Sequence, residues 1–304
     1  MKKEIYIFCL LLLLGGNLYG IINDLNDSTD NWTAIQYLNQ SDFYGDAQAN
    51  GGDIIGDSAY NQPGFYKRYD YGLDGEADGG DDTMAFRIRL ASDDSSYLLI
   101  GFDVDDGTNL GPDGTIDFYL GVSFATGNLT KDKIAFYSPG SSANDSPATA
   151  TFNDYSVYKN GNNNDFADYA NLSPVVLGVN EGYTGTDAST NLDGGDSTDY
   201  FVSFQVEMNV INAAYQGISG TTNLLTADSE MMMVLGSSGN DNNFNQDFAG
   251  IDGTTGASLP WTDPNGPGAP IYTAEGTTPV PESSSYALMF GALAGIVVFL
   301  RRRR

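Results

Sequence analysis

Aspartate dominates the acidic residues of this 304-residue chain, with 33 aspartates against seven glutamates. Glutamate is common on helices, whereas aspartate, asparagine and glycine favour turns, and aspartate also binds hard cations. Together with 37 glycines, this bias predicts an all-β domain with long loops lined by Asp, Asn and Gly. Adaptation to a saline habitat, where surplus surface acid maintains solubility, is a second explanation of the same bias.

Alternating apolar residues predict several strands in the middle of the chain. In residues 84–90 the apolar side chains take one face of a predicted strand, and the two arginines take the other. Residues 97–102 form a fuller apolar run, as expected of a strand covered on both faces, and residues 115–124 alternate most clearly. Such strands between Gly/Asn/Asp loops are typical of a β-sandwich. Shorter strands are predicted at residues 133–137, 156–158, 200–206 and 231–235, and a short helix at 209–215.

The N-terminus has the three parts of a secretory signal peptide. Two lysines follow Met1, residues 5–14 are apolar, and small residues lead to Gly20. We expect residues 1–20 to pass through the secretion translocon and to be removed by signal peptidase. Cys9 lies within the apolar run and is the only cysteine, so the mature domain must be stable without disulfides.

The C-terminus combines an apolar run with a terminal cluster of arginines. The run extends from Tyr286 to Leu300, has no charge and no proline, and would be about 22 Å long as a helix. That length is marginal for a bilayer core of about 30 Å, and it suits a segment that is later removed. The stop-transfer cluster holds the C-terminus on the cytoplasmic side. It consists of Arg301, Arg302, Arg303 and Arg304. An ordinary tail anchor is the alternative interpretation.

A short polar motif precedes the apolar run and carries a resemblance to a known family. Val280, Pro281, Glu282 and Ser283 stand directly before it. Motif, run and arginines together resemble the PEP-CTERM sorting signal over residues 279–304. The resemblance implies export in a bacterium with an outer membrane and an exopolysaccharide matrix, and recognition by an exosortase that cuts near Pro281–Glu282. Ser283 replaces the proline that is usual at that position.

The segment between the two termini is predicted to be a secreted acidic domain over residues 21–253, followed by a Pro/Gly/Thr-rich linker over 254–278. Residues 21–282, which end at the predicted cut, contain seven basic and 39 acidic residues, a net charge of −32. Nucleic acid is excluded as a partner because phosphate binding needs clustered Lys and Arg. Divalent cations and a neutral glycan or exopolysaccharide are compatible with this charge.

One loop concentrates carboxylates between two predicted strands. Asp103, Asp105, Asp113 and Asp117 flank or lie within it, and converging carboxylates repel one another unless a cation neutralises them. Ca²⁺ accepts six to eight oxygen ligands in flexible geometry, so it is the predicted metal. A solvated hairpin loop with two acidic caps is the alternative. The acidic segments 75–82, 193–199 and 241–247 are predicted to be turns rather than metal sites.

A second and looser resemblance concerns the domain itself. Residues 81–90, 101–117 and 245–247 are similar to secreted bacterial domains of DOMON or family 9 carbohydrate-binding type, over residues 32–253. The resemblance implies a jelly-roll-like β-sandwich, and some members of that family bind calcium and sugars.

These features are compatible with three functions. The favoured one is a non-catalytic protein of the cell surface or extracellular matrix. We expect the protein to arrive there after an intermediate stage in the inner membrane, with its C-terminus in the cytoplasm. The second is a glycan-binding module, which needs exposed aromatic rings such as Trp32 or Trp261 for sugar stacking; Tyr66, Tyr69 and Tyr71 are further candidates. The third is an enzyme. The chain has no histidine, which removes His-based mechanisms and leaves only a paired-carboxylate glycoside hydrolase as a remote alternative. We expect no enzymatic activity.

Overall fold

The computed structural model describes a set of segments that together form two antiparallel β-sheets and one helix. The described residues are 25, 32–35, 45, 47, 52–56, 64–70, 82–92, 97–104, 114–123, 133–139, 153–159, 169–176, 179, 189–192, 198–226, 229–240, 246–251, 259, 266 and 269–272. The predicted signal peptide, the sorting motif, the apolar C-terminal run and its arginines lie outside them, as do Asp105, Asp113, Tyr71 and Trp261.

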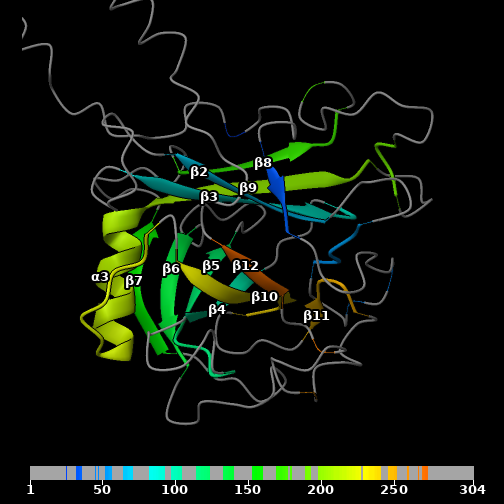
Figure 1. Cartoon of the computed structure of the whole chain (residues 1–304). Coiled ribbons are helices and arrows are strands. Elements are labelled where there is room, and N and C mark those ends of the chain that lie inside the picture. The colour runs from blue at the N-terminus through cyan, green and yellow to red at the C-terminus, as the bar shows by residue number, and fades with distance from the viewer. Residues whose placement is uncertain are drawn as a thin grey trace, which may run out of the picture.

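The smaller sheet has five strands, with β3 in the middle. Its order is β1 (Thr33–Ala34), β2 (Phe65–Asp70), β3 (Thr83–Leu90), β9 (Tyr200–Glu207) and β8 (Ala170–Pro174). Each neighbouring pair is antiparallel. In Figure 1 this sheet forms the upper layer.

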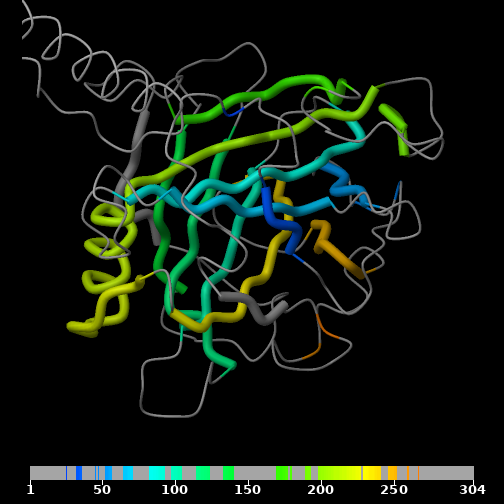
Figure 2. The backbone as a smooth tube through the Cα atoms, turned by 45° about the horizontal axis from the view of Figure 1, so that its top comes forward, coloured from blue at the N-terminus to red at the C-terminus, as the bar shows by residue number. Residues whose placement is uncertain are grey.

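The larger sheet has seven strands and forms the lower layer (Figure 1). Its order is β11 (Asp247–Phe248), β10 (Glu230–Ser238), β4 (Tyr97–Val104), β5 (Phe118–Ser123), β6 (Lys133–Ser138) and β7 (Asn153–Lys159), and β12 (Ala269–Tyr272) also pairs with β10. Figure 2 shows strands of this sheet running across those of the smaller one. Residues 269–272 fall within the predicted linker, and the structure pairs them with β10.

The prediction of a mostly β domain with one short helix is confirmed for the described residues. The strands predicted at 84–90, 97–102, 133–137, 200–206 and 231–235 correspond to β3, β4, β6, β9 and β10. The strand predicted at 115–124 begins only at Phe118, and the helix α3 is longer than predicted, at Met208–Ser219. Strands β1, β2, β8, β11 and β12 were not predicted.

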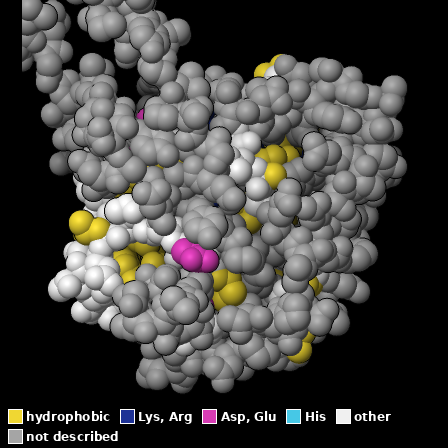
Figure 3. Space-filling model, viewed as in Figure 1, with side chains coloured by type: hydrophobic (Ala, Val, Ile, Leu, Met, Phe, Trp, Pro, Cys, Tyr) yellow, Lys and Arg dark blue, Asp and Glu magenta, His cyan; other side chains and the backbone are white. Residues whose placement is uncertain are grey.

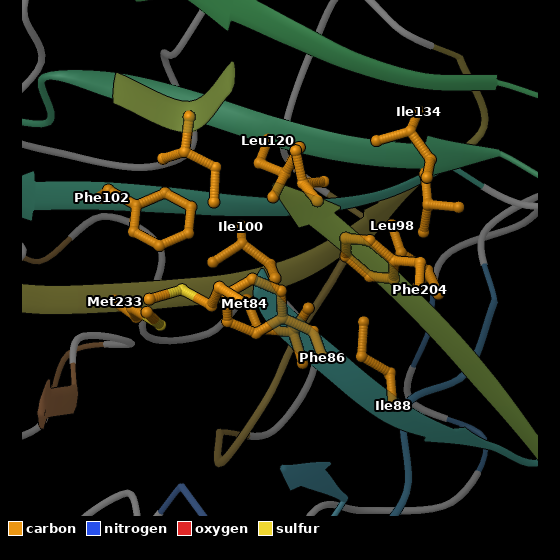
Figure 4. Close-up of a cluster of buried hydrophobic side chains, with 14 of the residues drawn as sticks. Met84, Phe86, Ile88, Leu98, Ile100, Phe102, Leu120, Ile134, Phe204 and Met233 are labelled. Atoms are coloured by element: carbon orange, nitrogen blue, oxygen red, sulfur yellow. The ribbon is translucent and has the colours of Figure 1, made fainter. Parts of the chain in front are cut away.

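The main hydrophobic core lies between the two sheets. Phe86 of β3 contacts Phe102 of β4 edge to face, with 5.9 Å between ring centroids, and Phe102 stacks on Phe118 of β5 at 4.7 Å. Figure 4 shows apolar side chains of both sheets pointing toward one another in this layer. Full burial of one such side chain contributes about 1.5–3 kcal/mol, so this layer is the main source of stability.

Helix α3 packs at one end of the two sheets (Figure 1). It follows β9 directly, and its Tyr215 ring lies 5.7 Å from that of Phe118. Met208, at its first position, donates its backbone N–H to the carbonyl oxygen of Asp82 at 2.8 Å. The helix ends at Ser219 and is capped by Gly220, whose φ of 75° is a left-handed conformation that glycine adopts at little cost.

The outer faces of both sheets are buried as well, which the alternation did not predict. On the larger sheet, Tyr119 faces outward but is only 1% exposed, and burial raises the pKa of its phenol. Its ring lies over Gly101 of the neighbouring strand, where a Cβ atom would come within 2.9 Å of the ring. Hydrophobic side chains of the described residues reach the surface in Figure 3 only as small, separate spots.

Candidate functional site

Two predicted metal ligands lie at the base of one loop. Phe102 of β4 and Phe118 of β5 are cross-strand partners, so Asp103 and Asp117, next to them in the chain, leave neighbouring strands at the same level. The backbone N–H of Asp117 donates to the carbonyl oxygen of Phe102 at 2.8 Å. Asp103 is 1% exposed and Asp117 is half-buried. The register of β4 and β5 therefore brings these two residues to the same end of the sheet.

Both carboxylates accept hydrogen bonds from the backbone of the loop. Asp103 Oδ2 accepts from the N–H of Gly114 at 2.7 Å, and Asp117 Oδ2 accepts from the N–H of Val104 at 2.9 Å. Each aspartate thus caps the opposite arm of the loop, as in the alternative interpretation of a hairpin with acidic caps. Each carboxylate also has a second oxygen, and carboxylate oxygens are the ligands that Ca²⁺ prefers. The geometry is compatible with both interpretations.

The structure does not place the full predicted ligand set. Asp105 and Asp113 lie outside the described residues. Among the residues that are described, no three Asp, Glu, His or Cys side chains are grouped in a way that could hold a metal ion. The calcium site therefore remains a prediction.

The three weaker acidic segments each contribute a buried, hydrogen-bonded aspartate. Asp82 accepts from the hydroxyl of Tyr69 at 2.6 Å, and Asp247 accepts from the backbone N–H of Ile54 at 2.7 Å. Asp199 forms a buried ion pair with Arg89. These aspartates join segments that are distant in the chain, so each has a structural role.

The predicted sugar-stacking aromatics that the structure describes are buried. Trp32 is 6% exposed, Tyr66 is 5% exposed and Tyr69 is 4% exposed. The ring of Trp32 is covered by the guanidinium of Arg87, whose central carbon lies 4.4 Å from the ring centroid. Stacking on a sugar requires a ring face open to solvent, and Trp32, Tyr66 and Tyr69 do not offer one. Trp261 lies outside the described residues.

A buried pair of arginines on the outer face of the smaller sheet was not predicted as a site. Arg87 and Arg89 were correctly assigned to the face opposite the core, but both are 0% exposed. Arg89 bonds Asp199 through Nε at 2.8 Å and through Nη2 at 2.7 Å, and its Nη2 also donates to the carbonyl oxygen of Ser189 at 2.8 Å. Their burial depends on segments 62 to 110 residues away in the chain, which no local pattern reveals.

Within the described part of the chain, no helix combines the length and apolar character needed to cross a bilayer. No family model matches the chain, and neither a curated protein nor a solved structure matches it.

Proposed function

We propose that this chain is an exported bacterial protein that an exosortase cuts near Pro281–Glu282, and that acts at the cell surface or in the extracellular matrix as a non-catalytic, calcium-binding domain. The observation that carries the proposal is the order of parts at the C-terminus. A Pro-Glu motif, an apolar run and four arginines follow one another within residues 279–304. The N-terminal signal peptide is the matching feature at the other end of the chain.

The packing of the domain supports this role indirectly. An exported domain without cysteine has no disulfides to constrain it, so its stability must come from burial, from bound metal, or from both. Here buried apolar clusters lie between the sheets and on both outer faces. Such packing is what a jelly-roll-like sandwich needs in order to persist outside the cell. The antiparallel two-sheet arrangement agrees with that finer fold assignment.

The calcium-binding part of the proposal rests on Asp103 and Asp117. The two residues stand on neighbouring strands at the loop base, and the loop between them carries Asp105 and Asp113. Ca²⁺ bound there would neutralise neighbouring carboxylates and draw the loop together, in line with its preference for several oxygen ligands.

Intact-mass spectrometry of the protein from its native host tests the processing. We expect an N-terminus at Ile21 and a C-terminus close to Glu282. A matched variant that lacks only Arg301–Arg304 should lose the C-terminal cut and keep the N-terminal one, because the arginines are needed to hold the tail in the membrane. Recovery of the uncut chain from the cytosol would refute the proposal.

A further inference from the structure

Strand β12 covers part of one edge of β10, although its residues fall within the predicted linker. Strand β4 pairs with β10 on one side, and β11 and β12 share the other side (Figure 1). On that side β11 pairs with Gly236 and Ser237, whereas β12 pairs with residues 230–233. Within the described part of the chain, β12 is therefore the strand that completes the sheet along the first four residues of this edge.

The backbone of β10 shows which of its groups face that edge. The carbonyl oxygen of Leu235 accepts from the N–H of Ala249 at 3.1 Å, so the backbone groups of Leu235 point to the side of β11 and β12. In an antiparallel strand the N–H and C=O of one residue point to the same side, and that side alternates along the strand. The register of β10 with β4 has no shift here, so Met231 and Met233 direct their backbone groups to the same edge. Both residues are 0% exposed, and buried backbone groups are costly unless they are paired.

The sequence of β12 meets this requirement. The two methionines lie opposite Ile271 and Ala269, which can both donate and accept. Pro270, which has no N–H, lies between them opposite Met232, where the backbone of β12 points away from β10. Four backbone groups of β10 thus depend on two residues of a segment that has the composition of a linker.

An uncovered sheet edge is a place where another chain can pair. Charged side chains commonly protect such edges, but residues 231–238 contain none, so this edge depends on β12. We propose that β12 is an autoinhibitory strand, and that a second copy of this chain pairs with the edge through its own β10 when β12 leaves it. The inference does not depend on the proposed processing, because a cut near Pro281–Glu282 lies beyond Tyr272 and leaves β12 in the product.

A second β10 fits the uncovered edge without opposing charges. Around a two-fold axis at Met232, Met231 of each copy would lie opposite Met233 of the other, and the backbone groups of both would again be paired. Glu230 of one copy would lie opposite Val234 of the other, so the two carboxylates would be apart. The net charge of −32 over residues 21–282 disfavours contacts between copies over acidic surfaces, whereas residues 231–238 are neutral.

Disulfide trapping in the full-length chain tests this pairing. A thiol introduced by Met232→Cys would lie on the two-fold axis, where cross-strand Cβ atoms are about 4.5–5.5 Å apart, close to the separation in a disulfide. Cys9→Ser removes the one native thiol. Ile271→Pro deletes an N–H that faces β10 and should release β12. With Ile271→Pro, Met232→Cys should form at least about tenfold more disulfide-linked dimer under a mild oxidant than without it.

Control variants separate the proposed pairing from a general loss of stability. Glu230→Cys with Ile271→Pro places the thiol away from the axis, and should give no more dimer than Met232→Cys alone. Ile271→Gly weakens β12 but keeps its N–H, so it should raise trapping at position 232 by a smaller factor. Ile251→Gly removes an isoleucine outside the strands and should not raise it.

The amount of trapped dimer decides the inference. Equal trapping at position 232 with and without Ile271→Pro would overturn it, as would equal trapping at positions 230 and 232 in a folded chain. Circular dichroism reports whether Ile271→Pro remains folded. If it unfolds, the comparison of Ile271→Gly with Ile251→Gly decides, and equal trapping in those two variants would overturn the inference.

Discussion

The buried ion pair between Arg89 and Asp199 offers the sharpest test of how the smaller sheet is stabilised. Both side chains are 0% exposed; Asp199 Oδ2 accepts a hydrogen bond from Nε of Arg89 at 2.8 Å and forms an ion pair with its Nη2 at 2.7 Å. The same oxygen accepts from the backbone N–H of Leu192 at 3.0 Å. Removal of one partner from a buried pair leaves an uncompensated charge and destabilises by about 3–5 kcal/mol.

Asp199→Asn should therefore lower the free energy of unfolding by about 3–5 kcal/mol. The free energy of unfolding of an ordinary domain is about 5–15 kcal/mol, so this loss is a large fraction of the total. Urea unfolding at neutral pH, followed by circular dichroism, measures it. Glu230→Gln is the matched control, because it removes a carboxylate at an exposed position and should change stability by less than about 0.5 kcal/mol.

A double-mutant cycle isolates the interaction from the loss of each side chain alone. Arg89→Met and Asp199→Asn together should be less destabilising than the sum of the two single changes, with a coupling of about 1.5–3 kcal/mol. A loss below about 1 kcal/mol for Asp199→Asn, or strict additivity in the cycle, would show that the pair is not buried and coupled as the structure has it.

Three other outcomes are expected. Gly64→Ala should destabilise by about 1–3 kcal/mol in urea, because its Cβ would lie 2.6 Å from the backbone carbonyl oxygen of Ile55, which cannot move aside cheaply; no loss would contradict this packing. Above pH 10 the unfolded chain releases the Tyr119 proton while the folded chain keeps it, since burial raises that pKa from its ordinary 10.0. Stability should fall there by up to about 1.4 kcal/mol per pH unit, and Tyr119→Phe should flatten this alkaline slope. Calcium should raise the melting temperature of the protein, and Asp103→Asn or Asp117→Asn should abolish the increase. If a chelator leaves the melting temperature unchanged, the metal site is refuted.

Strands with a clear apolar alternation were predictable because one face of each is in the main core. Strand β2 was missed since Lys67 occupies an inward position, as its pairing with Phe86 shows, and so interrupts the period of two. Strand β12 was missed because Pro270 and the prolines and glycines just before it, in residues 264–268, are typical of a linker. Its position in the sheet depends on the partner strand β10, which lies about 40 residues earlier and cannot be inferred from local composition.

The placement of Asp103 and Asp117 on neighbouring strands was predictable, but their role was not. Acidic residues at the end of one predicted strand and the start of the next indicated that the two would lie at the base of one loop. Whether such carboxylates cap backbone N–H groups or bind a cation depends on the geometry of the loop, which the sequence pattern does not predict. The arginines of β3 were predicted to face away from the core. Their burial was not, because Leu25 and Asp199, which cover and pair with them, come from distant parts of the chain.

The buried cations also affect how a calcium experiment must be interpreted. The exported part has only seven basic residues, and three of these, Lys67, Arg87 and Arg89, lie inside the fold. At most four basic residues are then left to offset the negative charge of the surface, so the carboxylates there repel one another strongly. Any divalent cation would relieve that repulsion by screening. A specific site at Asp103 and Asp117 must therefore show more stabilisation by Ca²⁺ than by Mg²⁺ at equal ionic strength, because only the larger ion accepts a flexible set of six to eight oxygens. Equal effects of the two ions would assign the stabilisation to the surface charge alone.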